Sequence, residues 1–329
     1  MDTRRNRINQ EAKRARALIL VLGGGVLLAL LMQGLLSFIT QDKILVNTST
    51  PAEIRIAEVK KFVSPYDKLI LEAHAVYVYE LRTGTVLFAK NENEKLPLAS
   101  VTKLMTALVA REHLKESAVL SITKDDLLAE GDSGLLSGER WRLGDLLNVM
   151  LLVSSNDAAH VISAFVGAEG LPSENVDASV ARTEFIKMMN VKARELNLTQ
   201  MQFFNESGLD VNPAENGGYG SAQNVAQLFA ELWKKYPETI EITAHKDARI
   251  FSQEKTAHIL PNTNEIVGHI PGLVASKTGF TNISGGNLTV IFDRGIGDPV
   301  IVVVLGSTYK GRFEDVQRLV SVATKMDAI

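Results

Sequence analysis

The sequence predicts an α+β protein in which helices flank an antiparallel sheet, preceded by one N-terminal transmembrane helix. Three observations support this fold class. Two β-rich stretches separated by a turn open the globular part, apolar helical patterns follow them, and two further β-rich stretches and a closing helix end the chain. With 329 residues, of which 46% are hydrophobic and 22% charged, the composition is that of a folded protein with a sizeable core.

The N-terminal region has the pattern of a membrane anchor. Residues 1–16 carry six Lys or Arg against two Asp or Glu, and residues 17–39 are almost continuously apolar. An apolar run of this length spans roughly 30 Å of hydrocarbon as a helix. No A-x-A-like cleavage site follows it, so we expect an uncleaved single-pass anchor. The basic flank places the N-terminus in the cytoplasm and the remainder of the chain outside it, periplasmic or extracellular. Residues 40–71, which contain several turn-forming residues, are predicted to be a stalk, and the catalytic domain is predicted over 72–329.

A hairpin and a helix open the globular part. Residues 73–81 and 85–89 are rich in β-forming residues, and Arg82-Thr83-Gly84 lies between them. Pro97 then breaks the chain, and from Val101 the apolar residues recur at helical spacing.

Ser100 and Lys103 lie at the start of this predicted helix. Residues three apart share a helix face, so the Lys103 amine can reach the Ser100 oxygen. A serine nucleophile needs a neighbouring base, and a desolvated lysine can provide it. Taken alone, the pair also fits a helix cap followed by an exposed lysine.

The middle of the chain is predicted to be helical. Residues 142–153, 180–198 and 221–233 have helical patterns. After the first of these, Ser154-Ser155-Asn156 forms a polar break where side chains can project into a cleft, and where Ser155 or Asn156 can also cap the next helix. The Gly- and Asn-rich segment 212–220 is interpreted as turn chemistry.

The C-terminal part adds strands and a helix. Residues 287–292 and 300–305 are predicted strands, and 312–328 is a predicted amphipathic helix. Before them, Lys277-Thr278-Gly279 is predicted on a strand edge, where it presents a cation and a hydroxyl and where the glycine lets a ligand approach the backbone.

Composition excludes several classes of site. The chain has no cysteine, so disulfides, zinc–thiolate centres and cysteine nucleophiles are excluded. The six histidines form no close pair, and we expect neither a metal nor a cofactor. The first 16 residues have a balance of +4 and the whole chain −3, so the remaining residues carry −7, and we expect no nucleic-acid binding.

Three short motifs occur in a fixed order: Ser100-x-x-Lys103, Ser154-Ser155-Asn156 and Lys277-Thr278-Gly279. This set resembles the S-x-x-K, S-x-N and K-T-G motifs of the penicillin-recognising serine enzymes. The stretches LPLASVTKLMTALVA, MLLVSSNDAAHVIS, FFNESGLD and SKTGFTNISGGNL resemble the D-alanyl-D-alanine carboxypeptidases and endopeptidases, the low-molecular-mass penicillin-binding proteins. The resemblance runs from about residue 73 to 328. It implies a β-lactamase/transpeptidase-like fold with an all-helical subdomain, a membrane-anchored serine D-Ala-D-Ala carboxypeptidase acting on peptidoglycan stem peptides, and covalent inhibition by β-lactams.

The resemblance also implies the role of each site residue. Ser100 attacks the substrate carbonyl to form an acyl-enzyme, Lys103 takes its proton, and Ser154 passes that proton to the leaving amine. The substrate-binding residues are Asn156, Lys277, Thr278, Gly279, Phe280 and Thr281, and the N–H groups of Ser100 and Phe280 form the oxyanion hole.

The two lysines are expected to have different tasks. A free lysine has a pKa of about 10.4, so Lys103 must be buried to act as a base near neutrality. Lys277 is expected to keep its charge and bind the substrate's anionic end.

Two features depart from the family. Ser155 replaces the more usual glycine of the second motif, and Phe280 stands where histidine is frequent.

Four alternatives to a carboxypeptidase remain open. One is a catalytically dead scaffold, against which the intact Ser100, Lys103 and Lys277 argue. A DD-endopeptidase that cleaves cross-links would use the same motifs. A β-lactamase would carry a glutamate in an E-x-x-x-N setting, but Ala193 stands four residues before Asn197. A β-lactam sensor would need a larger cytoplasmic part than 16 residues.

Overall fold

The computed structural model describes residues 64–128, 130, 131, 133–169, 171 and 176–326. The predicted basic tail 1–16, the transmembrane segment 17–39 and most of the predicted stalk lie outside these residues. Within the described part of the chain, no helix combines the length and apolar character needed to cross a membrane.

The helices and strands follow in a mixed order along the chain. The helices are α2 (Lys103–His113), α3 (Leu143–Leu152), α4 (Asn156–Ala168), α5 (Ala178–Glu195), α6 (Ala222–Lys235), α7 (Pro237–Ile240) and α8 (Gly311–Met326), with short 3-10 turns η1 (Pro65–Lys68), η2 (Ala99–Thr102), η3 (Asp125–Leu128), η4 (Glu241–Ala244) and η5 (Val267–His269). The strands are β1 (Ala75–Glu80), β2 (Thr85–Lys90), β3 (Leu96–Pro97), β4 (Val119–Ser121), β5 (Arg140–Arg142), β6 (Gln202–Phe203), β7 (Asp210–Asn212), β8 (Glu215–Asn216), β9 (Gly218–Gly220), β10 (Asp247–Phe251), β11 (Ala257–Pro261), β12 (Leu273–Thr281), β13 (Gly285–Asp293) and β14 (Pro299–Ser307).

The largest sheet among the described residues has five strands in the order β12-β13-β14-β1-β2, and every neighbouring pair is antiparallel. The hairpin predicted at 73–89 is β1–β2, and the strands predicted at 287–292 and 300–305 are β13 and β14. The antiparallel sheet predicted from the sequence is therefore confirmed. The first and last strands of the described chain are neighbours in this sheet: β1 pairs with β14, and Val78 lies opposite Val302.

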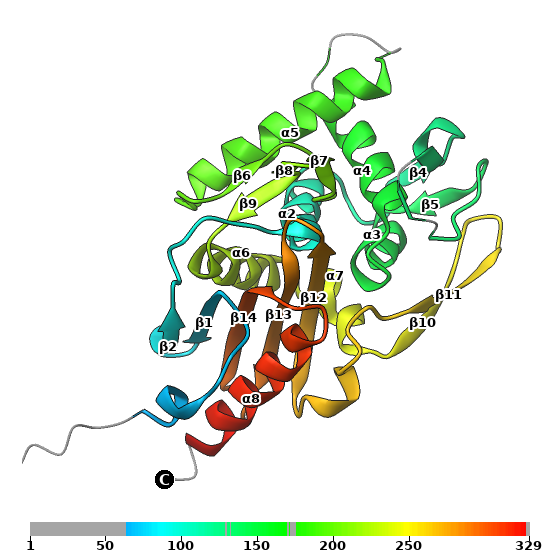
Figure 1. Cartoon of the computed structure of the whole chain (residues 1–329). Helices are drawn as coiled ribbons and strands as arrows, with labels where there is room; N and C mark the ends of the chain where they lie inside the picture. Colours follow the sequence, from blue (N-terminus) through cyan, green and yellow to red (C-terminus); the bar gives the residue numbers. More distant parts are fainter. Residues whose placement is uncertain (1–63, 129, 132, 170, 172–175, 327–329) are drawn as a thin grey trace, which may run out of the picture. The chain divides into compact units, whose positions relative to one another are not determined.

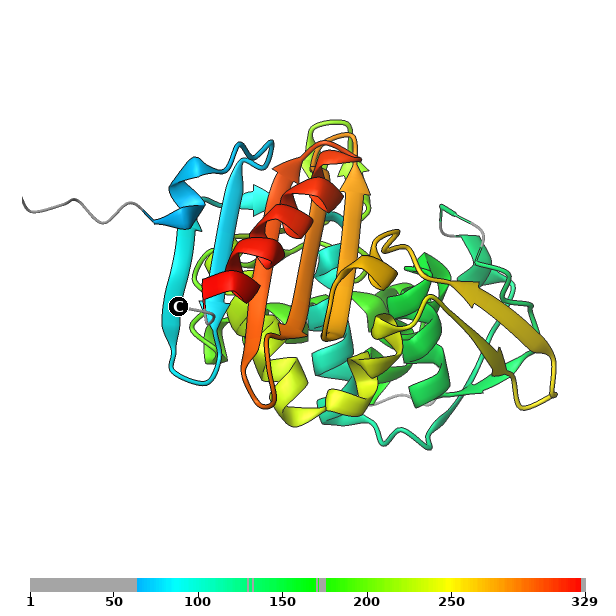
Figure 2. The same cartoon turned by 90° about the horizontal axis from the view of Figure 1, so that it is seen from below.

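Both faces of this sheet are buried. Strand residues alternate between faces, so Val302 and Val304 of β14 lie in the core with α8, whereas Val303 and Leu305 lie in the core with α2 and α6. Figures 1 and 2 show α8 lying across one face of the sheet, with α2 and α6 on the other. Helices α3, α4 and α5 form a second helical group, beyond α2 as seen from the sheet, which agrees with the expected helical subdomain.

The described end of the predicted stalk packs against the sheet. Tyr66 of η1 is buried and stacks on Phe88 of β2 with ring centroids 5.2 Å apart. Tyr66, Leu69 and Leu71 thus contribute to the core under α8, although they belong to the predicted stalk.

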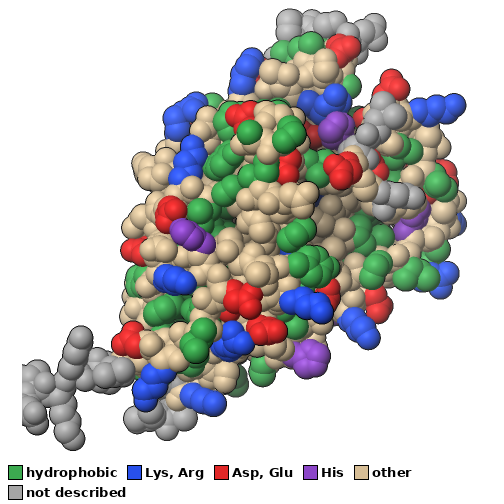
Figure 3. All heavy atoms as spheres, viewed as in Figure 1, with side chains coloured by type: hydrophobic (Ala, Val, Ile, Leu, Met, Phe, Trp, Pro, Cys, Tyr) green, Lys and Arg blue, Asp and Glu red, His purple; other side chains and the backbone are tan. Residues whose placement is uncertain are grey.

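The surface carries no block of one charge on the face seen in Figure 3. Acidic and basic side chains alternate over that face.

Candidate active site

Ser100 lies in the 3-10 turn η2, which runs directly into α2. The residue before it, Ala99, has φ = +48°, a left-handed conformation that an L-residue adopts only where its surroundings hold it. The Ala99 N–H donates to the buried Asn216 Oδ1 at 3.3 Å. This contact fixes the backbone beside Ser100, whose side chain is partly exposed.

Lys103 is fully buried, and its amine is enclosed by oxygen atoms. Its Nζ contacts Ser100 Oγ at 2.9 Å, Asn156 Oδ1 at 2.7 Å and the Ser207 carbonyl at 2.8 Å. Burial lowers the pKa of Lys103 to about 7, although the charge of Glu206 acts in the opposite direction. Near neutrality a large fraction of Lys103 is therefore uncharged and able to accept the Ser100 proton.

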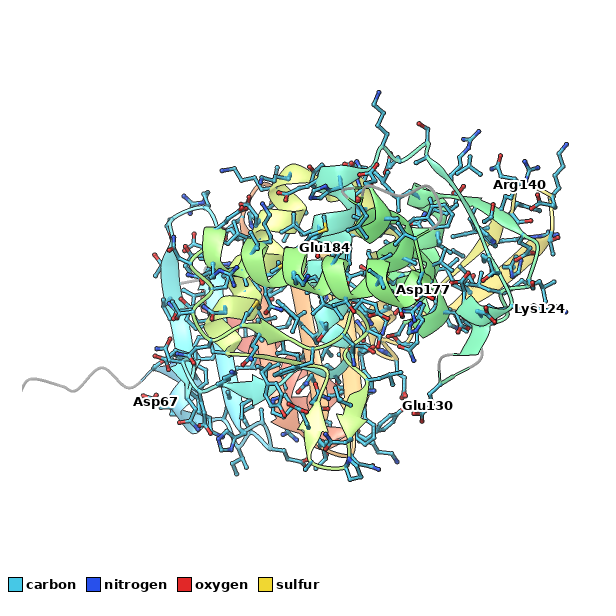
Figure 4. The ribbon with its side chains drawn as sticks, turned by 90° about the horizontal axis from the view of Figure 1, so that it is seen from above. Asp67, Lys124, Glu130, Arg140, Asp177 and Glu184 are labelled. Atoms are coloured by element: carbon cyan, nitrogen blue, oxygen red, sulfur yellow. The ribbon has the colours of Figure 1, made fainter. Side chains whose placement is uncertain are left out.

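Ser154 and Asn156 lie in the connection between α3 and α4. Ser155 caps α4, because its Oγ accepts a hydrogen bond from the Ala158 N–H at 3.0 Å. Ser154 has φ = +64°, so the chain bends sharply before the cap. The Asn156 amide donates to the carbonyl of Glu130 at 2.6 Å and thereby turns its oxygen toward Lys103; Glu130 is labelled in Figure 4.

Lys277, Thr278 and Gly279 belong to β12, the edge strand of the sheet. Lys277 is buried, and its Nζ donates to Ser154 Oγ and to the Thr278 carbonyl, both at 2.9 Å. Thr278 Oγ1 lies 2.6 Å from Thr263 Oγ1. Lys277 therefore joins the third motif to the second. The predicted position of the third motif on a strand edge agrees with the place of β12 in the sheet.

The pKa of Lys277 is lowered well below its usual value. Burial is the largest cause, followed by the positive charges of Lys103 and Arg312. This direction differs from the expectation that Lys277 keeps its charge in the free protein. A carboxylate bound beside Lys277 would favour the ammonium form, because opposite charges stabilise each other.

Gly279 packs directly against the backbone of η2. A Cβ at this position would lie 2.7 Å from the Leu98 carbonyl oxygen and 3.2 Å from the Ser100 nitrogen. The absence of a side chain therefore brings β12 and the Ser100 backbone close together.

A cleft of about 320 Å³ opens above these groups. Its lining includes Ser100, Ser154, Thr263, Thr278, Phe280 and Arg312. Both lysines lie beneath its floor, with relative exposures of 0% and 1%.

Arg312, at the start of α8, was not singled out in the sequence. Its Nη1 donates to the Gly279 carbonyl at 2.8 Å, and its guanidinium lies against the rings of Tyr309 and Phe313. Its place within an amphipathic helix gave no local signal of a role in the cleft. The contact with Gly279 across 33 positions exists only in the folded chain.

Asn216 was also missed, because the segment 212–220 was interpreted as turn chemistry. Its amide is fully buried and joins Ala99 N to the Gly208 carbonyl and to Thr281 Oγ1. This segment therefore supports η2 as well as turning the chain.

The structure brings together nearly all of the predicted site residues. Ser100, Lys103 and Asn156 form one hydrogen-bonded group, Ser154 and Lys277 a second, and Thr278, Gly279 and Phe280 line the cleft. The side chain of Thr281 instead contacts Ser284 at 3.2 Å in the turn after β12. Among the described residues, no group of three or more His, Asp or Glu side chains is placed to hold a metal ion.

The family model described as D-alanyl-D-alanine carboxypeptidase matches residues 63–308, a range that contains all of these motifs. The chain belongs to the D-alanyl-D-alanine carboxypeptidase family. This is a family of serine-type hydrolases, and the resemblance noted in the sequence is confirmed.

Individual members of the family give the same result. The chain is 30% identical over 262 residues to the D-alanyl-D-alanine carboxypeptidase DacF of Bacillus subtilis, over 78% of this chain and 63% of that protein. It is 29% identical over 251 residues to a D-alanyl-D-alanine endopeptidase of Escherichia coli, over 74% of each chain. The chain thus spans less than two thirds of the Bacillus carboxypeptidase.

Solved structures agree with the fold. Penicillin-binding protein D2 of Listeria monocytogenes, solved in an ampicillin-bound form, has a TM-score of 0.64 and 29% identity, over 77% of this chain and 98% of that one. The transpeptidase-like fold expected from the sequence is therefore confirmed for the described part of the chain.

Proposed function

We propose that this protein is a serine D-Ala-D-Ala carboxypeptidase that acts on peptidoglycan stem peptides through an acyl-enzyme on Ser100. The observation that carries the proposal is the contact between the Ser100 hydroxyl and the buried amine of Lys103, whose pKa is about 7. A base with a pKa near the working pH combines a useful uncharged fraction with sufficient basicity.

The first step is acylation. Lys103 accepts the Ser100 proton while Oγ forms a bond to the carbonyl carbon of the penultimate D-Ala. The carbonyl oxygen becomes an oxyanion, and the N–H groups of Ser100 and Phe280 donate to it. Each such donor contributes about 3 kcal/mol to lowering the barrier.

The second step expels the terminal residue. As the C–N bond breaks, the leaving nitrogen needs a proton, which passes from Lys103 through Ser154. Lys277, Thr278 and Arg312 hold the carboxylate of the departing residue, since Thr278 and Arg312 line the cleft and Lys277 lies beneath it beside Ser154 and Thr278, where a bound carboxylate would favour its charged form. Water then hydrolyses the ester and regenerates Ser100.

The β-lactams belong to the same proposal. The solved relative with ampicillin bound supports the expectation that a β-lactam acylates Ser100. Ala193 stands where a class A β-lactamase would carry its deacylating glutamate, so we propose slow release of the bound drug. The membrane anchor at 17–39 and an exported catalytic domain complete the proposal and depend on the sequence pattern alone.

A DD-endopeptidase is the second candidate, because the chain is 29% identical to an endopeptidase of E. coli, against 30% for the Bacillus carboxypeptidase. Both reactions cleave a bond next to D-Ala, and they differ in what leaves. Incubation with purified muropeptide monomers and cross-linked dimers, followed by mass spectrometry, separates them. Loss of one alanine from monomers supports the carboxypeptidase, splitting of dimers supports the endopeptidase, and unchanged substrates would reject both.

A further inference from the structure

A buried acid and a histidine lie behind Lys103, and the mechanism above uses neither. Glu206 belongs to the segment after β6, and its side chain is 3% exposed. His160 lies on α4, with its Nδ1 2.6 Å from Glu206 Oε1. The two residues are 46 positions apart in sequence, so only the fold brings them together.

The backbone next to Glu206 is tied to the catalytic helix. The carbonyl of Ser207 accepts a hydrogen bond from Lys103 Nζ at 2.8 Å, and the carbonyl of Glu206 accepts one from Thr106 Oγ1 at 2.6 Å. Lys103 and Thr106 lie on the same face of α2, three residues apart. Glu206 is therefore held next to the base of the reaction.

The other side of the pair is tied to the second motif. Asn156 and His160 are four residues apart on α4 and share a face. Asn156 contacts the Lys103 amine at 2.7 Å, and His160 contacts the carboxylate behind it. One face of α4 thus supplies a partner to the base and a partner to the acid.

The charges in this region oppose one another. Glu206 favours the charged form of Lys103 and so acts against its use as a base. Burial is the largest single influence on Glu206 and raises its pKa. The contact with His160, a backbone hydrogen bond and Arg182 together outweigh burial, so the pKa is lowered and the carboxylate stays ionised. Besides His160, the charged groups that interact with Glu206 are Lys103 on α2 and Arg182 on α5, and Lys277 on β12 interacts in turn with Lys103. Arg182 belongs to α5, the helix on which Glu184 and the N-cap residue Asp177 are labelled in Figure 4.

We propose that His160 and Glu206 form a positioning pair that tunes Lys103: the contact with His160 offsets the effect of the Glu206 carboxylate on Lys103 and lets Lys103 give up its proton. The side chain of His160 is 27% exposed, whereas Glu206 is enclosed. The inference depends on the proposed role of Lys103 as the base for Ser100.

The experiment measures acylation by a fluorescent penicillin in stopped flow, with the full chain in detergent, from about pH 5 to about pH 9. In His160→Gln, Glu206 loses its contact with His160 and acts more strongly on Lys103, which holds its proton more tightly. The acidic limb of the acylation rate should move to higher pH by about one unit. In Glu206→Gln it should move to lower pH, and the double variant should follow Glu206→Gln.

The variant His160→Lys distinguishes an electrostatic effect of residue 160 on Lys103 from a purely structural role of His160. It places a cation near Glu206 at all working pH values, so its acidic limb should lie at or below that of the wild type. His74→Gln is the matched control, because His74 Nε2 also lies 2.8 Å from a glutamate, Glu94, but this pair is exposed and remote from Lys103. Its profile should be unchanged.

Rates that fall equally at every pH in His160→Gln, with the limb in place, would overturn the inference. If His160→Gln does not fold, an unmoved limb in Glu206→Gln would overturn it instead. Lys103→Ala distinguishes the two levels of the proposal. A normal acylation rate in Lys103→Ala would reject the proposed mechanism together with the pair, whereas a slow Lys103→Ala combined with an unmoved His160→Gln limb rejects the pair alone.

Discussion

Lys277 Nζ lies 2.9 Å from Ser154 Oγ, although 123 positions separate the two residues in the sequence. This contact joins the edge strand β12 to the loop between α3 and α4. It also places the amine that is proposed to bind the substrate's acid next to the hydroxyl that is proposed to pass on the proton. The group proposed to recognise the terminal carboxylate and the group proposed to protonate the leaving amine therefore lie side by side.

Ser100→Ala should abolish covalent labelling by a fluorescent penicillin. The variant removes the oxygen atom that forms the acyl bond, while the small side chain leaves η2 intact. Gel fluorescence after denaturation measures the label, and a thermal melt checks the fold. Ser117→Ala, an exposed serine after α2, is the control and should label normally. Persistent labelling of Ser100→Ala would place the nucleophile elsewhere.

The acylation rate should rise as the pH passes through about 7, because Lys103 acts as a base only after it loses its proton and its pKa is lowered to about 7. Below that pH the rate should fall about tenfold for each unit. Stopped-flow acylation across the pH range measures this limb. A rate that rises only toward pH 10, the range of a free lysine, would show that burial does not activate Lys103.

Arg312→Gln should raise KM for a peptide ending in D-Ala-D-Ala by roughly tenfold, because one charge-assisted contact to the carboxylate contributes about 1.5 kcal/mol. The effect on kcat should be smaller. Steady-state release of D-alanine measures both constants. Arg318→Gln is the control, since Arg318 lies on the same helix but pairs with Glu314 at the surface. Equal KM values in the two variants would argue against Arg312 as a carboxylate ligand.

Gly279→Ala should slow acylation by at least about tenfold and destabilise the fold by about 1–3 kcal/mol, the usual cost of overpacking. The added Cβ would lie 2.7 Å from the Leu98 carbonyl and push η2, and with it Ser100, away from β12. Denaturant unfolding and penicillin labelling measure the two effects. Gly268→Ala is the control, since nothing lies within 4 Å of its added Cβ. Normal acylation in Gly279→Ala would show that this packing does not position the nucleophile.

Much of the fold could be predicted from local patterns. The β1–β2 hairpin, the α2 helix and the β13–β14 pair are rich in apolar residues because these residues face the two cores. The hairpin of β10 and β11 was not predicted. Its strands are largely exposed, with His258 and Leu260 as its buried members, so an apolar pattern is weak there.

The candidate site likewise contains residues that local sequence patterns predict and residues that they do not. Ser100, Lys103 and the residues of the other two motifs are visible because each motif is short and contiguous. Arg312, Asn216 and Glu206 act through contacts between distant segments, and each of them has an unremarkable local context. Long-range contacts of this kind are set by tertiary packing, which local patterns do not encode.

The residues that line the cleft are far apart in the sequence. Ser100 lies in η2, whereas Arg312 lies in α8. During synthesis, a chain that has not yet docked α8 holds its serine without the completed cleft. Only molecules in which α8 has docked should therefore react with penicillin. The labelled fraction of a preparation measures the fraction of molecules that are completely folded.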